Sequence, residues 1–341
     1  MKENLKVLVS GLKKKTLTIG VAVMLGACGS TQAKQQPIKI DGSSTVYPIT
    51  QKLVEQFNAT DKPDVEVSAS FSGTGGGFKK FCAGETDINN ASRPILKNEM
   101  EACKQNKISY IELPIGFDAL TIVVNQANTW AKDITVSELA KIWALEGQGK
   151  ITKWNQVRSS WPDKPLILFG PGADSGTYDY FAEAIVGSAK ATRSDYTASE
   201  DDEVLVTGVS KEPNALGYFG YAYYVENKDK LKSLAVDSGN GAIAPTKTAV
   251  EQAKYQPLAR PLFIYVNAVS AQNNPLMNEF IDFYMNNAQA AVNSVGYVAF
   301  GEESYMKLYR NYHKTKVGTV FGGEAQLNLT IYEVLTKRTE Y

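Results

Sequence analysis

The hydrophobic and polar positions of the first third of the chain follow strand and helix periods in turn. Residues 38–42 and 64–73 alternate apolar and polar side chains, which predicts two strands. A further helix is expected at about 76–83 and a strand at 87–92. Between the first two strands, residues 45–60 predict a helix with one apolar face formed by Ile49, Leu53, Val54 and Phe57. This alternation predicts an α/β fold, a sheet covered by helices, with ligand-binding loops at the strand ends.

Two long apolar segments, each containing a proline, divide the rest of the chain. They are residues 111–126 and 256–267, and both have the composition of strands. The block between them has elements of its own, so it is expected to form a second lobe inserted between two crossover strands. We therefore expect lobe I at 38–117, lobe II at 118–262, and a return to lobe I with a C-terminal extension at 263–341.

The N-terminal residues 1–27 have the features of a secretory signal. Lysines precede a short apolar run, which is too short to span a bilayer as a helix. The run ends in LGAC, which resembles a bacterial lipobox and predicts that Cys28 carries a lipid anchor, followed by a polar tether over 28–37. The alternative is a chance cysteine at the end of a signal helix. The expected location is the periplasm or cell envelope, with the protein held at the membrane by its lipid.

Charge and cysteine content narrow the class of protein. Lys and Arg balance Asp and Glu at 36 each, and removing residues 1–27 leaves an acidic excess, so no basic surface for nucleic acid is expected. Cys82 and Cys103 remain after lipidation, and in an oxidising compartment we expect them to form a disulfide; a reduced, buried pair is the alternative. With His313 as the only histidine, no metal or other cofactor is expected.

Two turns in the first part of the chain are rich in hydrogen-bond donors. The segment DGSSTVYP carries the hydroxyls of Ser44 and Thr45 between a predicted strand and helix, a position suited to an anion. Capping of the helix is the simpler explanation. The segment SGTGGG places Thr74 beside three glycines whose N–H groups could approach a ligand closely; a flexible loop is the alternative.

Two further turns have the same character. The segment NASRPI ends a strand with Ser92 and Arg93, and a guanidinium there offers a planar fork for an oxyanion, unless it is a surface arginine in an ion pair. The segment GPGADSGT precedes an aromatic helix, where its side chains could cap the helix and also bind an anion. Its candidate residues are Asp174, Ser175, Gly176 and Thr177.

Enzymatic and adhesive functions fit the sequence less well than anion binding. A Ser-His-Asp site is not expected with a single histidine in a charged stretch, and Ser304-x-x-Lys307 lacks the companion motifs of penicillin-recognising enzymes. A surface lipoprotein that adheres to a matrix would account for the anchor and for 18 tyrosines, but not for the clustered turns. We therefore expect a binding protein and not an enzyme.

Taken together, the segments DGSSTVYP, SGTGGG, ASRPI, SGT and ALGYFGYAYY resemble the periplasmic phosphate-binding proteins of ABC-type phosphate uptake, the PstS family, and its SphX-like branch. The resemblance spans about residues 38–320. It implies a two-lobe, type II periplasmic binding fold that closes on inorganic phosphate, a membrane-embedded ABC permease as partner, and a monomer. Binding of another tetrahedral oxyanion is the alternative. By position, the resemblance implies phosphate donors at Ser44, Thr45, Thr74, Ser175, Gly176 and Thr177.

The sequence departs from the family at two positions. Better-known members carry an aspartate after the AS of the third segment and an arginine four residues before the SGT serine, whereas this chain has Arg93 and Pro171 there. We therefore expect Arg93, beside Ser92, to neutralise the phosphate. Asp174 is the candidate, on chemical grounds alone, for the carboxylate that accepts the phosphate proton.

Overall fold

The computed structural model describes most of the chain from residue 36 onward. The predicted signal, Cys28 and nearly all of the tether lie outside the described residues. The residues described are 36–60, 66–188, 191–324 and 326–337. Across these ranges, no helix is both long and apolar enough to cross a membrane.

The first sheet has five strands in the order β2-β1-β3-β13-β4. β1 is parallel to β2 and β3, while β13 runs antiparallel to both β3 and β4. The sheet is therefore mixed, with the chain returning to it after the whole inserted block. Its strands are β1 (Ile38–Gly42), β2 (Val67–Ala69), β3 (Ile88–Ala91), β4 (Tyr110–Ala119) and β13 (Ala259–Asn267).

The second sheet has five strands in the order β10-β5-β9-β7-β8, all from the block between β4 and β13. β7 is parallel to β8 and β9, and β5 is antiparallel to β9 and β10. The strands are β5 (Thr121–Asn125), β7 (Ile167–Pro171), β8 (Thr197–Ser199), β9 (Ala215–Phe219) and β10 (Leu231–Ser233). A small third sheet joins β6 (Asp133–Thr135), β11 (Ala235–Asp237) and β12 (Ala242–Ile243).

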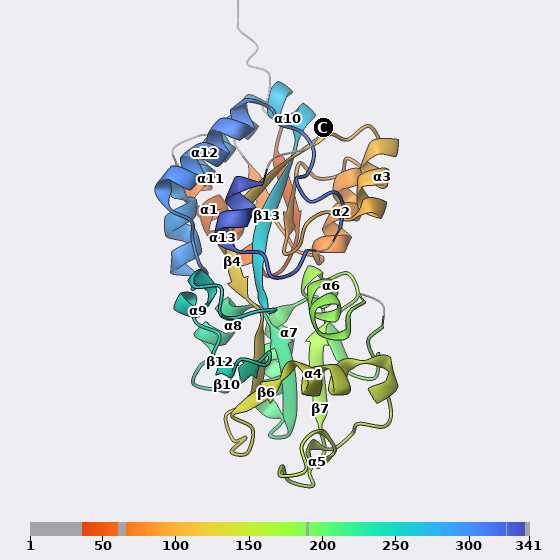
Figure 1. Cartoon of the computed structure of the whole chain (residues 1–341). Helices are drawn as coiled ribbons and strands as arrows, with labels where there is room; N and C mark the ends of the chain where they lie inside the picture. Colours follow the sequence, from red (N-terminus) through yellow and green to blue (C-terminus); the bar gives the residue numbers. More distant parts are fainter. Residues whose placement is uncertain (1–35, 61–65, 189–190, 325, 338–341) are drawn as a thin grey trace, which may run out of the picture. The chain divides into compact units, whose positions relative to one another are not determined.

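Helices lie on both sides of the first sheet. Figure 1 shows α1, α11 and α12 on one side of β13 and α2 and α3 on the other, and α1 packs against α11 while α2 packs against α3. The helices around this sheet are α1 (Tyr47–Asn58), α2 (Thr74–Cys82), α3 (Lys97–Gln105), α10 (Ala268–Asn273), α11 (Pro275–Ser294), α12 (Glu302–His313) and α13 (Ile331–Thr336).

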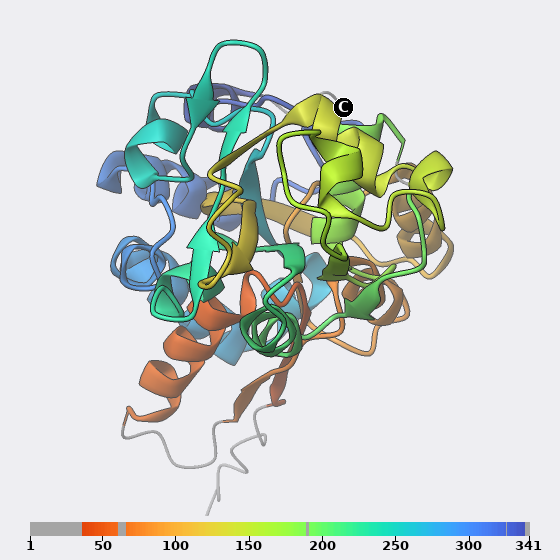
Figure 2. The ribbon, with the colours of Figure 1, turned by 90° about the horizontal axis from the view of Figure 1, so that it is seen from below.

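The helices of the inserted block gather around the second sheet, and the view in Figure 2 looks onto this part of the chain. α7 packs against β5, β7, β8 and β9. The helices are α4 (Val136–Trp143), α5 (Trp154–Val157), α6 (Gly176–Phe181), α7 (Asp202–Lys211), α8 (Tyr221–Glu226) and α9 (Lys247–Glu251), with a 3-10 turn at Leu145–Gly147 and a π-helical turn at Ala182–Val186.

The apolar pattern of the sequence accounts for these elements. In α1 the side chains of Ile49, Leu53 and Phe57 are buried along one face, as their spacing predicts, and Pro48 occupies the first turn, where no N–H is needed. The strand expected over 64–73 is shorter in the structure, because the chain turns towards α2 after Ala69.

The two apolar segments flanking the inserted block behave as crossover strands. Residues 111–126 divide into β4, which belongs to the first sheet, and β5, which belongs to the second. β13 pairs with β4 along its full length, and eight of its nine residues are buried. A charged side chain on either strand is therefore held in the protein interior.

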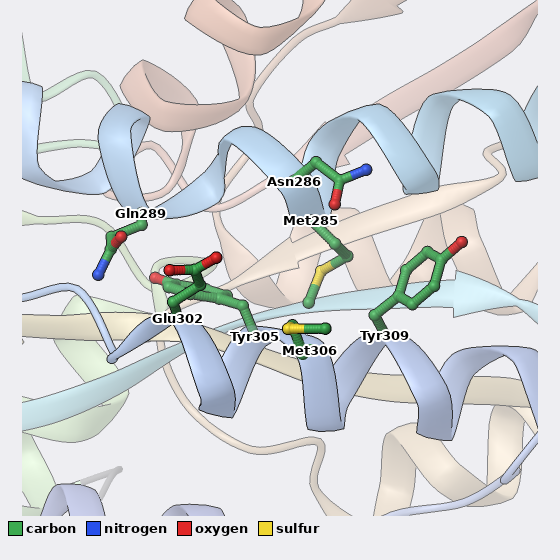
Figure 3. Close-up of a pocket in the computed structure, with 7 residues that line it drawn as sticks. All are labelled: Met285, Asn286, Gln289, Glu302, Tyr305, Met306 and Tyr309. Atoms are coloured by element: carbon green, nitrogen blue, oxygen red, sulfur yellow. The ribbon is translucent and has the colours of Figure 1, made fainter.

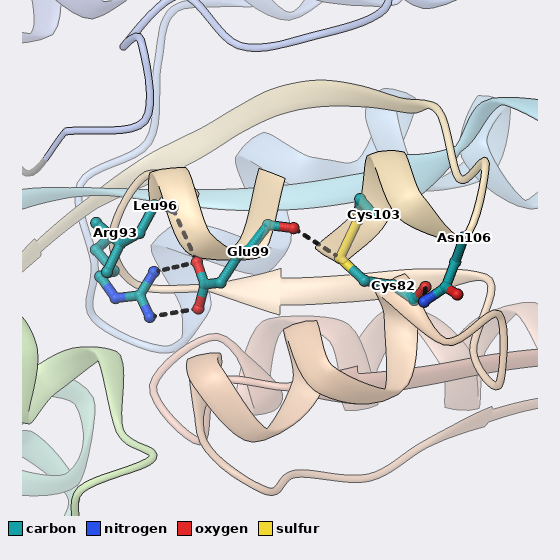
Figure 4. Close-up of a disulfide and its surroundings, with 6 residues drawn as sticks. All are labelled: Cys82, Arg93, Leu96, Glu99, Cys103 and Asn106. Carbon is teal, nitrogen blue, oxygen red and sulfur yellow. Dashed lines mark hydrogen bonds and ion pairs between the residues drawn. A yellow bond between two sulfur atoms is a disulfide. The ribbon is translucent and has the colours of Figure 1, made fainter. Parts of the chain in front are cut away.

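Cys82 and Cys103 form a disulfide between α2 and α3, with their Cα atoms 4.2 Å apart. Figure 4 shows this bond on the helix that also carries Glu99, the partner of Arg93. The disulfide joins two helices that flank two of the predicted donor turns.

Candidate functional site

The predicted donor turns come from both sheets and lie in the protein interior. One group follows strands of the first sheet: Ser44 and Thr45 after β1, Thr74 at the start of α2, and Ser92 after β3. The other group, Ser175, Gly176 and Thr177, follows β7 of the second sheet. Each of the six hydroxyl side chains belongs to a residue at most 4% exposed. So many buried hydroxyls require partners, which makes the group a candidate polar site.

Contacts between the two groups bring the turns into one cluster. The Thr45 hydroxyl of the first group lies 3.1 Å from the Thr177 hydroxyl of the second. The Thr74 and Ser92 hydroxyls lie 3.2 Å apart, and a Cβ atom placed on Gly176 would stand only 2.7 Å from the Ser92 oxygen. Only glycine therefore allows this close approach. We call these residues the hydroxyl cluster: Ser44, Thr45, Thr74, Ser92, Ser175, Gly176 and Thr177.

Helix capping explains only part of this arrangement. The Ser175 hydroxyl does cap α6, accepting a hydrogen bond from the Thr177 N–H at 3.0 Å. At α1, however, the residue in the cap position is Val46, with no side-chain cap, and it is Ser43 whose hydroxyl accepts from the Val46 N–H at 3.4 Å. The side chains of Ser44 and Thr45 are thus left for other contacts.

A buried ion pair adjoins the hydroxyl cluster, and sequence analysis missed it. Asp118 on β4 and Arg260 on β13 are direct cross-strand partners, and both side chains are fully buried. The Arg260 Nε and Nη2 atoms donate to Asp118 Oδ2 at 3.0 and 2.8 Å. Nη2 also donates to the Thr177 hydroxyl at 2.9 Å and to the Thr45 hydroxyl at 3.2 Å.

The remaining nitrogen of this guanidinium has no partner. Arg260 Nη1 is buried and makes no hydrogen bond with any described residue. A buried cationic donor without a partner is costly, so its persistence indicates an anionic ligand. The sequence did hold a signal: Arg260 is the one charged residue of the segment 256–267, and Asp118 is one of two acidic residues, with Glu112, in the largely apolar segment 111–126.

A second buried carboxylate, also missed from the sequence, stands at the first residue of α7. Asp202 is 3% exposed, and burial raises its pKa to about 7, against the opposing effects of a hydrogen bond with Ser44 and the positive charge of Arg260. Its neighbours therefore include a member of the hydroxyl cluster and the cation beside it. Asp202 stands among acidic neighbours, Glu200, Asp201 and Glu203, and a run of this kind is typical of a solvated surface, so the local pattern gives no sign that its side chain is buried.

Arg93 forms its ion pairs with residues outside the hydroxyl cluster. Its Nε donates to Asp179 of α6 at 2.7 Å, and its Nη1 and Nη2 form a two-pronged contact with Glu99 of α3 at 2.8 Å each (Figure 4). Arg93 is therefore better described as an ion-paired arginine than as an anion ligand. The ion pair is buried, whereas the sequence suggested one on the surface. The structure argues against Arg93 as the residue that neutralises an anion.

Asp174 also lies apart from the hydroxyl cluster in its side-chain contacts. Its carboxylate is 47% exposed and forms an ion pair with Lys79 at 2.6 Å, while its backbone oxygen accepts from the Gly75 N–H at 2.8 Å. A half-exposed carboxylate with a lysine partner is poorly placed to accept a proton from a buried ligand. The structure argues against the proton-accepting role expected for Asp174.

The surface pocket drawn in Figure 3 is not the anion site. It lies between α11 and α12, and its charged lining residue is Glu302, which would repel an anion. The described residues include no group of three histidine, cysteine or acidic side chains placed to hold a metal ion. The buried hydroxyl cluster with Arg260 remains the candidate.

Comparisons with known proteins identify the family of this chain. Residues 28–288 match the model of the PBP superfamily domain. Protein SphX of Synechocystis sp. is 52% identical over 93% of this chain and 94% of its own, and the phosphate-binding protein PstS of Staphylococcus epidermidis is 39% identical over 85% and 89%. The crystal structure of a possible phosphate binding protein from Planctomyces limnophilus is 43% identical with a TM-score of 0.61, covering 83% of this chain and 99% of that one.

Proposed function

Because the chain belongs to the PBP superfamily, we propose that it binds inorganic phosphate outside the cytoplasm and delivers it to an ABC-type phosphate importer. The observation that carries this proposal is the hydroxyl cluster, contributed by both sheets, around a fully buried arginine with an unpartnered nitrogen. A dehydrated oxyanion needs this combination of neutral donors and one cation.

Bound phosphate would replace the hydrogen bonds that the hydroxyls of the cluster make with one another. The four oxygens of the ion would accept hydrogen bonds from the hydroxyls of both lobes, replacing the hydroxyl-to-hydroxyl contacts at 3.1 and 3.2 Å. Arg260 would supply the positive charge, with Asp118 fixing the plane of its guanidinium. Its unpartnered nitrogen would gain an acceptor.

Ligand entry requires the two lobes to separate, since the cluster is buried. Thr45 and Thr177 stand on elements of different sheets that are connected through the crossover strands β4 and β13. Hinge opening between these strands would expose the donors, and closure would remove water from the ion. For these lobes we keep the boundaries predicted from the sequence, 38–117 with 263–341 and 118–262.

Three further parts of the proposal concern export, membrane attachment and oligomeric state. We expect export by the signal over residues 1–27 and attachment to a membrane through lipid on Cys28. We expect a monomer, because one chain supplies donors from both lobes. No reaction is proposed at the cluster, because its hydroxyls and the Arg260 guanidinium are donors suited to holding an anion.

Titration calorimetry with phosphate tests the proposal. Thr74→Val removes one hydroxyl of the cluster, and a lost hydrogen bond to a charged ligand should weaken binding by about ten- to a hundredfold. Thr50→Val is the matched control, since Thr50 is also fully buried and hydrogen-bonded, to Asn90 and Tyr284, yet has no contact with the cluster among the described residues. Absence of phosphate binding by the unmodified protein would refute the function, and equal losses in both variants would refute the site.

A further inference from the structure

Arg93 is held by two helices of the first lobe, α2 and α3. Its Nη1 and Nη2 donate to the Glu99 carboxylate of α3 at 2.8 Å each, and its guanidinium carbon lies 5.9 Å from the centre of the Phe78 ring of α2. The remaining nitrogen, Nε, donates to Asp179 of the second lobe at 2.7 Å. The direction of the Arg93 side chain, and with it the contact between the lobes, therefore depends on the positions of α2 and α3.

Helix α3 has little packing of its own to fix its position. Of its nine residues, all of which the structure describes, Cys103 alone is buried. A surface helix is normally held by an apolar face that packs on the core. The disulfide instead ties α3 to the end of α2, where Phe78, Phe81 and Cys82 are all buried. The disulfide therefore takes the place of an apolar face in holding α3 against the first lobe.

The disulfide also lies close to Glu99. Cys103 follows Glu99 by four residues, so the two side chains share one face of α3. Figure 4 shows Cys82 Sγ beside the Glu99 backbone oxygen, at 3.4 Å. A shift of α3 relative to α2 would therefore move Glu99 and turn Arg93 away from its partner in the second lobe. Asn106 also donates to the Cys82 backbone oxygen, at 2.9 Å, so loss of the disulfide should loosen α3 without detaching it.

We propose that the Cys82–Cys103 disulfide positions the Glu99 carboxylate, and through it Arg93, so that phosphate affinity depends on the oxidation of this cysteine pair. The inference rests on the proposed function, because the contact between Arg93 and Asp179 can favour only the closed form of the two lobes. Glu99 and Arg93 are positioning residues in this scheme. Reduction by a dithiol would convert the disulfide to two thiols while the reagent forms a disulfide of its own, and phosphate affinity should fall.

Calorimetry with phosphate on the full chain tests this inference. Replacing Cys82 and Cys103 by alanine should weaken phosphate binding about three- to tenfold, because part of the contact between Arg93 and Asp179 is lost. The same replacement in an Asp179→Asn background should change the affinity less than about twofold, since that contact is already weakened. The free energy of unfolding should fall equally in both backgrounds, so a purely structural role of the disulfide would not give this pattern.

Met277→Ala is the matched control. Met277 is fully buried on α11, which lies on the opposite side of the first sheet from α2 and α3 (Figure 1), and its truncation also destabilises the first lobe. Phosphate affinity should stay within about twofold of that of the unmodified protein. A loss equal to that of the cysteine replacement would show that any loosening of the lobe weakens binding, and would overturn the inference.

An affinity unchanged by the cysteine replacement, or an equal loss in the Asp179→Asn background, would also overturn the inference and leave the proposed function standing. Should the cysteine replacement fail to fold, Glu99→Gln decides, because it keeps the disulfide and removes the charge that orients Arg93. It should weaken phosphate binding about three- to tenfold, and an unchanged affinity would contradict the inference. Failure of the unmodified protein to bind phosphate at all would refute the proposed function itself.

Discussion

The contact between Arg93 and Asp179 predicts that closure of the lobes contributes to phosphate affinity. Arg93 follows β3 of the first sheet and Asp179 lies on α6 beside the second, so hinge opening would break their 2.7 Å contact. The substitution Asp179→Asn removes the negative charge from this ion pair. It leaves the contact between Arg93 and Glu99, which lies within the first lobe, intact.

The size of the effect follows from burial. The Arg93 and Asp179 side chains are 4% and 18% exposed, so solvent screens their contact only weakly. A charge-assisted hydrogen bond contributes about 1.5 to 3 kcal/mol, and the asparagine oxygen can still accept, so a loss of about 1.5 kcal/mol is expected. That loss would weaken phosphate binding about tenfold, because the contact stabilises only the closed form.

A second ion pair between the lobes, formed by Lys79 and Asp174, serves as the control. Lys79 and Asp174 are 70% and 47% exposed, and pairs of this kind contribute little. Calorimetry should therefore show less than about a twofold change for Asp174→Asn. Equal effects of Asp179→Asn and Asp174→Asn would contradict the role of burial. Tighter phosphate binding by Asp179→Asn would show that Arg93, once released, contacts the ion as the sequence suggested.

Three further predictions concern packing, the disulfide and pH. Gly176→Ala would press a methyl group into the hydroxyl of Thr74, so phosphate affinity measured by calorimetry should fall by at least about tenfold, and an unchanged affinity would exclude close approach. Replacing Cys82 and Cys103 by serine opens a loop with a sequence separation of 21, which should lower the urea-measured free energy of unfolding by about 3 kcal/mol; a loss under about 1 kcal/mol would contradict the chain-entropy argument. Burial raises the pKa of Glu112 from 4.5 to about 7, so the native state binds its proton more tightly and stability should fall as the pH rises across this interval. Glu112→Gln should make that decline shallower without abolishing it, because burial also raises the pKa values of Asp202 and Glu200 to about 7, and a decline of unchanged slope would refute the assignment.

The elements that bury one face were predictable from the sequence because their periodicity is local. The helix over 45–60 and the crossover segments 111–126 and 256–267 appear in the structure as α1, β4 with β5, and β13. The hydroxyl turns were also found, because each lies between a strand and a helix. The sequence could not predict which side chain of the other lobe each of these residues contacts.

Charged residues show this limit most clearly. Arg93 looked like an anion ligand because it ends a strand beside Ser92, but Asp179, its partner, lies 86 residues further along the chain. Asp202 stands in an acidic run that is typical of a solvated helix start, and only the packing of α7 makes it a buried neighbour of Ser44. In both cases tertiary packing decided the role, and local pattern could not.

The position of the buried ion pair explains how one site can be both preformed and movable. Asp118 and Arg260 stand opposite each other on the paired strands β4 and β13, so their contact does not depend on the angle between the lobes. The contact between Thr45 and Thr177 joins elements of different sheets and must break when the lobes separate. An entering anion would therefore meet a fixed cation first and gain the hydroxyls of the second lobe on closure. The fixed charge would thus attract the anion, and closure would complete its hydrogen bonds.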